Sequence, residues 1–209
     1  MMRHIPGICV VVALLSISLP QEARADDLST PKGAVTSYFK AMRAGDAIAA
    51  NAAAVVSKED EALTNAGAAE NRAKAMLIAA ATKRWGAETT ARKIGWVGDI
   101  LVMMLEKASV TVDGDRAVIG KAGDFVCQRI NNQWRFDRSA PRRDEPISAS
   151  IERCKKAAEV NQRLAEEIDA GRWNSLDDVL RERNANVPPP PPPPLPPGFP
   201  ATEPADPAR

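Results

Sequence analysis

The sequence is short of the side chains that enzymes most often use for proton transfer and metal binding. Its 209 residues include one histidine, His4, one tyrosine, Tyr38, and three cysteines. His4 lies in a segment that we expect to be removed, which leaves the mature chain without an imidazole for a metal site or a nucleophile-activating pair. Glycine-rich phosphate loops and metal-spaced cysteine pairs are missing too. We therefore expect no cofactor and no metal.

Charge of one sign is also lacking. The 28 basic and 27 acidic side chains give a formal net charge of +1, so no global field draws the chain to nucleic acid or anionic lipid. We expect no nucleic-acid partner. Acidic residues are interleaved with Arg135, Arg138, Arg142 and Arg143, which favours a solvated surface over an anion site.

The first 25 residues have the pattern of a cleavable export signal. A basic start precedes an apolar run from Ile8 to Leu19, and Ala23-Arg24-Ala25 lies ahead of Asp26. The run has 12 residues, against about 20 for a helix that spans a bilayer, so cleavage after Ala25 is favoured over a membrane anchor. The expected product is exported, periplasmic or secreted, with no stable membrane insertion.

Proline is scarce until the end of the chain. Twelve of the 17 prolines lie in the last 22 residues, seven of them in a row from Pro188 to Pro194. Residues 187–209 hold almost nothing that could build a core, so we expect a disordered tail that begins with a polyproline rod about 31 Å long. Such a rod serves as a solubilising tail, a docking peptide or a spacer across the cell envelope.

Between signal and tail, the apolar pattern begins with helical periodicity. The expected helix boundaries are N-caps at Thr30, Asp46 and Ser57 and stops at Gly45 and Gly86. These boundaries predict three helices in succession, the third rich in alanine, with Gly67 as a candidate break in its first half.

Two hairpins follow these helices. Strand-forming runs flank Asp113-Gly114-Asp115 and then Asn131-Asn132-Gln133, which predicts at least four antiparallel strands in a meander. Asp113 and Asp115 fit a turn better than a calcium site, because the rest of a calcium loop is absent. Periodicity leaves residues 94–105 undecided between strand and helix.

Residues 141–186 are predicted to be a helical segment, with a long helix that starts near Ile147 and ends before Gly171. Its apolar side chains occupy one stripe, which must pack on the preceding sheet or on a copy of itself. A homodimer through the sheet face or the long helix follows as an expectation.

Three features follow one another along the chain: a helix from Pro31 to Gly45-Asp46, two further helices, and hairpins that end in Trp134-Arg135-Phe136-Asp137. Together they resemble the nuclear transport factor 2-like superfamily of cone-shaped α+β domains. The resemblance covers about residues 30–138. It implies an α+β fold for residues 26–140, with N-terminal helices packed on a curved antiparallel sheet, before the long C-terminal helix and the proline-rich tail.

That superfamily includes enzymes of the ketosteroid isomerase and dehydratase type and many members without catalytic activity. The isomerases use a tyrosine of the first helix and buried carboxylates, which makes Tyr38, Asp99 and Asp124 the candidate catalytic residues. The residues themselves favour another interpretation: Tyr38 packs in the core beside Phe39, and the two aspartates, each preceded by glycine, lie in turns. We expect a non-catalytic protein that binds an unknown protein or a small apolar ligand; a carboxylate-dependent enzyme and an envelope spacer are the alternatives.

Two cysteines, Cys127 and Cys154, remain after removal of the signal, an even number in a compartment where disulfides persist. Cys127 is predicted on a strand and Cys154 on the apolar stripe of the following helix, so a bridge would hold that helix to the sheet. Two buried thiols that act as small apolar side chains are the equal alternative.

The signal pattern predicts that the mature chain begins at Asp26. Intact-mass analysis of the protein from the soluble exported fraction should give a chain that lacks residues 1–25. Recovery of a membrane-bound protein that retains them would contradict the prediction.

Overall fold

The computed structural model describes residues 27–94, 98–120, 125–138 and 146–189, and over residues 98–102 it describes the backbone alone. The described residues form seven helices and one five-stranded sheet, so the protein is α+β. The helices are α1 (Pro31–Ala44), α2 (Ala47–Ala52), α3 (Lys58–Trp85), α4 (Ala87–Lys93), α5 (Gly98–Lys107), α6 (Ile147–Asp169) and α7 (Leu176–Asn186). The strands are β1 (Ala54–Val55), β2 (Val110–Asp113), β3 (Arg116–Ile119), β4 (Phe125–Ile130) and β5 (Gln133–Asp137). The predicted signal peptide and most of the predicted tail lie outside the described residues.

Local capping explains where the first three helices begin. The side chains of Thr30 and Asp46 accept hydrogen bonds from the exposed N–H groups of the first turns of α1 and α2. Ser57 and Asp60 form a reciprocal capping box at the start of α3. Gly45 ends α1 with φ of +72°, in the left-handed region that glycine adopts without strain. These boundaries are the predicted ones.

The sheet has the order β1-β5-β4-β3-β2. The four strands β2 to β5 are antiparallel neighbours, which confirms the predicted meander. Asn131 and Asn132 have φ of +51° and +62°, as a two-residue turn between β4 and β5 requires. The pattern did not predict β1, a two-residue strand that pairs parallel with β5, so the sheet is mixed.

The undecided segment before the sheet is helical. In α5, Leu105 is 2 % exposed and packs with Ala117 and Ile119 of β3. Lys32 of α1 donates a hydrogen bond from Nζ to the carbonyl oxygen of Glu106 at 2.8 Å, which ties the end of α5 to the start of α1. Tertiary packing of one apolar face thus decides what periodicity left open.

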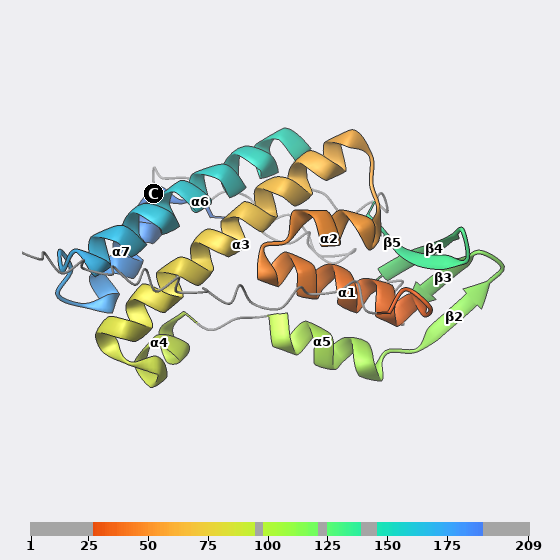
Figure 1. Ribbon diagram of the computed structural model, residues 1–209, viewed down its shortest axis with the longest axis horizontal. Helices are drawn as coiled ribbons and strands as arrows, with labels where there is room; N and C mark the ends of the chain where they lie inside the picture. The colour runs from red at the N-terminus through yellow and green to blue at the C-terminus, as the bar shows by residue number, and fades with distance from the viewer. Residues whose placement is uncertain (1–26, 95–97, 121–124, 139–145, 190–209) are drawn as a thin grey trace, which may run out of the picture.

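One core lies where α1 crosses the sheet, at the right of Figure 1. Val35 and Ala34 of α1 pack with Cys127 and Trp134, while Tyr38 and Ala41 pack with α2 and β1. At the boundary between these two clusters, the ring of Phe125 contacts those of Phe39 and Phe136 edge to face.

Helices α3 and α6 lie side by side and run in the same direction (Figure 1). Their first turns share a groove, and at their far ends Lys83 Nζ lies 3.0 Å from Asp169 Oδ1. The apolar stripe of α6 therefore packs on α3 and α7. The expectation that this stripe would pack on the sheet or on a second copy was wrong, because the 28-residue α3 extends beyond the sheet and offers an alanine-rich face of its own.

Helix α3 also holds α1. Asn71 Nδ2 and Arg72 Nη2 donate to the carbonyl oxygens of Met42 and Gly45 at 2.8 and 2.7 Å, which ties the end of α1 to α3. Gly67 does not interrupt α3. A Cβ at this position would lie 2.9 Å from Met42 Cε, so the glycine leaves room for the flexible end of the Met42 side chain.

A second core closes the other end of the molecule. Leu77, Ala80 and Ala81 of α3 pack with Val160 and Leu164 of α6 and with α7. Within this second core Asn161 is fully buried, and its Oδ1 accepts a hydrogen bond from Arg183 Nε of α7 at 2.7 Å. Burial, and then the charge of Arg183, lower the pKa of the neighbouring Lys74.

Substitution of Leu77 tests how much the second core contributes to stability. Because its side chain is fully buried, Leu77→Ala should lower the free energy of unfolding by about 2 to 5 kcal/mol, measured by urea denaturation. The matched control is Met76→Ala, whose side chain is 44 % exposed and whose loss should cost less than about 1 kcal/mol. Equal losses of unfolding free energy in the two variants would contradict the assignment of Leu77 to the second core.

Candidate functional site

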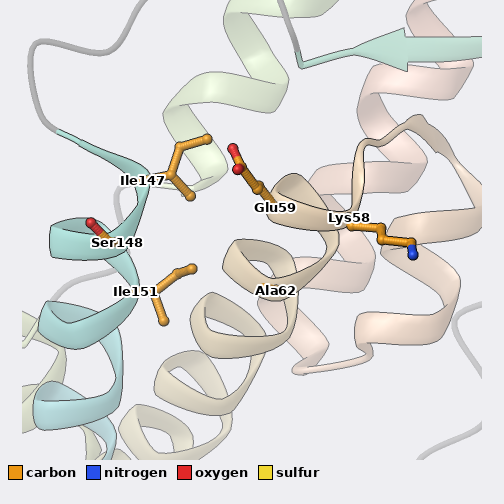
Figure 2. A pocket seen from close by; sticks show the side chains of 6 residues that line it. All are labelled: Lys58, Glu59, Ala62, Ile147, Ser148 and Ile151. Carbon is orange, nitrogen blue, oxygen red and sulfur yellow. The ribbon is translucent and has the colours of Figure 1, made fainter.

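The apolar groove between the first turns of α3 and α6 is the best candidate site. Its volume is about 440 Å³, within the range of small-molecule pockets. We call it the α3–α6 groove, and its lining residues are Lys58, Glu59, Ala62, Ile147, Ser148 and Ile151. Figure 2 shows the side chains of Ile147 and Ile151 directed from α6 toward α3, where Ala62 lies.

The charges at this groove are few and lie at its edge. The carboxylate of Glu59 lies beside Ile147, whereas the Lys58 ammonium points away from both isoleucines (Figure 2). Asp60, the next residue, is 5 % exposed and is engaged in the capping box of α3. Among its described lining residues, the groove therefore offers hydrocarbon and one carboxylate, that of Glu59, directed toward Ile147.

A second hollow of about 450 Å³ lies between α6 and α7. Its lining residues are Lys156, Glu159, Val160, Arg163, Glu182 and Asn186. Arg163 Nη2 lies 3.0 Å from Glu182 Oε1, and Arg163 Nη1 lies 3.3 Å from Glu167 Oε1. This hollow is mainly a place where charges on two helices pair, so it offers little to a ligand.

Tyr38 lines neither of these hollows. It is 4 % exposed, and its ring contacts Phe39 and Phe136 edge to face, with centroids 5.3 and 5.2 Å away. The Arg138 guanidinium lies over the same ring at 5.3 Å. The ring thus packs in the core, the interpretation that the residues themselves favoured. The backbone of Asp99 lies in the first turn of α5, so the expectation that this residue lies in a turn was wrong. The Asp99 side chain and the whole of Asp124 lie outside the described residues, as do Ala25 and Asp26.

Cys127 and Cys154 are buried thiols in the structure, and no disulfide joins them within the described residues. Cys127 lies on β4 against α1, where its Sγ is 3.4 Å from the carbonyl oxygen of Pro31. Cys154 lies on α6, and α6 packs on α3 rather than on the sheet. The structure thus has the second of the two predicted states, because the helix that carries Cys154 belongs to a different layer.

Burial raises the pKa of the Cys127 thiol to about 12, and the negative charge of Asp137 acts in the same direction. Asp137 is 7 % exposed and accepts a hydrogen bond from Gln128 Nε2 at 2.7 Å. A thiol held neutral in this way is a poor nucleophile, so Cys127 is a packing residue.

The remaining candidates from the sequence have structural positions. Asp113 and Asp115 lie exposed at the turn between β2 and β3. Arg138 Nη1 donates to Thr64 Oγ1 at 2.5 Å, so it connects the end of β5 to α3. Arg142 and Arg143 lie outside the described residues. The described parts of the chain contain no group of three or more His, Cys, Asp or Glu side chains placed to hold a metal ion.

Among the helices that the structure describes, none is both long enough and apolar enough to cross a bilayer. Comparison with known proteins finds no family model, no curated protein and no solved structure that matches this chain. The function must therefore be argued from the chain's own residues.

The Cys127 thiol gives a pH prediction. Its pKa in the folded protein, about 12, lies above its ordinary value of 9.0, so its contribution to stability is complete below pH 9 and is lost as the pH rises toward 12. Urea unfolding of the mature chain should show this loss, and Cys127→Ala should reduce it. Denatured, unreduced protein should titrate two thiols per chain; no reactive thiols would instead show a disulfide.

Proposed function

We propose that the protein is an exported, non-catalytic binding protein of the cell envelope that takes a small apolar ligand in the α3–α6 groove. The groove carries the proposal. It places two half-buried isoleucine side chains and an alanine around a volume of about 440 Å³, and removing this hydrocarbon from water favours an apolar ligand at about 25 cal/mol per Å².

Charge narrows the ligand further. Of the two charged residues among the described lining, Glu59 lies toward Ile147, while the Lys58 ammonium points away (Figure 2). A negative rim repels anions and leaves neutral or cationic molecules favoured. The ligand class is therefore an apolar molecule with a neutral or positively charged polar end.

The non-catalytic part of the proposal rests on Tyr38. The hydroxyl-bearing ring that an isomerase-like mechanism would need is packed between Phe39 and Phe136 under Arg138. Export is supported by the pattern of residues 1–25.

The proposal also includes a cone-like arrangement of the nuclear transport factor 2-like type for the first helices and the sheet. It is supported by the way α1 crosses one face of the antiparallel strands β2 to β5, with Trp134 and Phe136 beneath it. The parallel strand β1 and the α3–α6 pair are additions to that arrangement. The ligand site that we propose lies in these additions.

Binding can be measured with N-phenyl-1-naphthylamine, a neutral apolar dye whose fluorescence rises on leaving water. The mature chain should bind it saturably. Ile151→Glu should weaken binding about tenfold or more, because a carboxylate would then face an apolar ligand. The matched control is Ile48→Glu on α2, where the side chain is 85 % exposed and lines no described hollow; its affinity should not change.

The effect of the Glu59 charge can be measured separately with an anionic dye. Glu59→Gln should strengthen binding of the anionic dye 1-anilinonaphthalene-8-sulfonate and leave the neutral dye unaffected. Equal losses of dye binding in the Ile151 and Ile48 variants, or dye binding that does not saturate, would overturn the proposed site.

A further inference from the structure

Among the described residues, no strand pairs with the outer edge of the sheet at β2. β2 is the last strand in the order β1-β5-β4-β3-β2, and all four of its residues are exposed. An exposed edge strand presents N–H and C=O groups that can pair with a strand of another chain. Proteins usually protect such edges with lysine, proline or a bulge, and the sequence of β2, Val-Thr-Val-Asp, carries one charge, at its end.

The register shows which backbone groups face outward. Gly120 N donates to Ser109 O at 2.9 Å, and Thr111 lies opposite Val118. Bonded and non-bonded pairs alternate along an antiparallel ladder, so Thr111 bonds to β3, whereas Val110 and Val112 direct their N–H and C=O groups away from it. Two donors and two acceptors are thus available on this edge.

The same two residues carry exposed apolar side chains. Val110 and Val112 lie opposite Ile119 and Ala117, on the face that Leu105 covers farther in. They are nevertheless 37 % and 52 % exposed. Met103 and Met104 of α5 are 59 % and 64 % exposed. At Val110 and Val112, open backbone groups and exposed hydrocarbon therefore coincide.

We propose that a second copy of this chain pairs with β2 in antiparallel register about a two-fold axis at Thr111. Val110 then lies opposite the partner's Val112, and Val112 opposite the partner's Val110. Both outward-facing residues of each protomer exchange two backbone hydrogen bonds, four in all. The two sheets become one sheet of ten strands.

Self-complementarity selects a second copy over an unrelated strand. In this register Asp113 lies opposite the partner's Ser109, so no carboxylate faces another. One patch thus supplies both halves of a two-fold interface. Because β2 has four residues, the contact is small and the dimer should form in the micromolar range.

Sedimentation of the mature chain tests the association. Between about 1 and 200 µM the average mass should rise from that of one chain toward that of two. Val112→Lys places a charge on the edge, and Val110→Pro removes an outward N–H without touching the β2–β3 ladder; each should keep the chain monomeric with an unchanged circular dichroism spectrum. The matched control Ile130→Lys, a 37 % exposed residue of β4, should dimerise like the unchanged chain.

Cross-linking tests the register. Thr111→Cys places two thiols opposite each other in a non-bonded pair, where Cα atoms lie about 4.5 Å apart, so mild oxidation should give a reducible dimer. Asp113→Cys lies opposite the partner's Ser109 and should not cross-link. A chain that stays monomeric at 200 µM, a Val112→Lys variant that dimerises unchanged, or equal cross-linking at positions 111 and 113 would each overturn the proposal.

Discussion

Strand β1 runs parallel to β5, and the helices that follow them in the chain, α3 and α6, also run parallel. Val55 lies opposite Asp137, and α3 begins three residues after Val55. The first turns of α3 and α6 line one groove, and both helices leave it in the same direction. The molecule's two cores, one under α1 and one under α7, are joined by the length of α3.

This arrangement depends on small side chains. Ala80 and Ala81 pack against α6 and α7, and Gly67 leaves room for Met42 of α1, so α3 contacts helices on two sides at close range. In the first turns of α3 a small side chain leaves space unfilled. Ala62 has too little volume to fill the space in front of Ile147 and Ile151, and the groove between α3 and α6 is the result.

The two edges of the sheet are treated differently. At one edge β1 has two residues and lies among α1, α2 and β5, so it offers little to another chain. At the other edge β2 is exposed along its whole length. The buried polar groups, by contrast, join elements within the molecule. The hydrogen bond between Asn161 and Arg183 connects α6 to α7, and the one between Arg138 and Thr64 connects the end of β5 to α3. The two surfaces proposed above as contact sites, the α3–α6 groove and the β2 edge, both carry apolar side chains.

Local chemistry in the sequence was sufficient for the helix boundaries at Thr30, Gly45, Asp46, Ser57 and Gly86 and for both hairpins, because caps and turns depend on neighbouring residues alone. Which element each apolar face packs against was determined by the tertiary structure. The stripe of α6 looked the same whether it would meet a sheet, a copy of itself or α3, and the short β1 has too few residues to show a period. The state of Cys127 and Cys154 depended on which layer α6 joined. The α3–α6 groove exists because two helices that begin about 90 residues apart in the chain begin side by side in space. No spacing within either segment determines such a meeting.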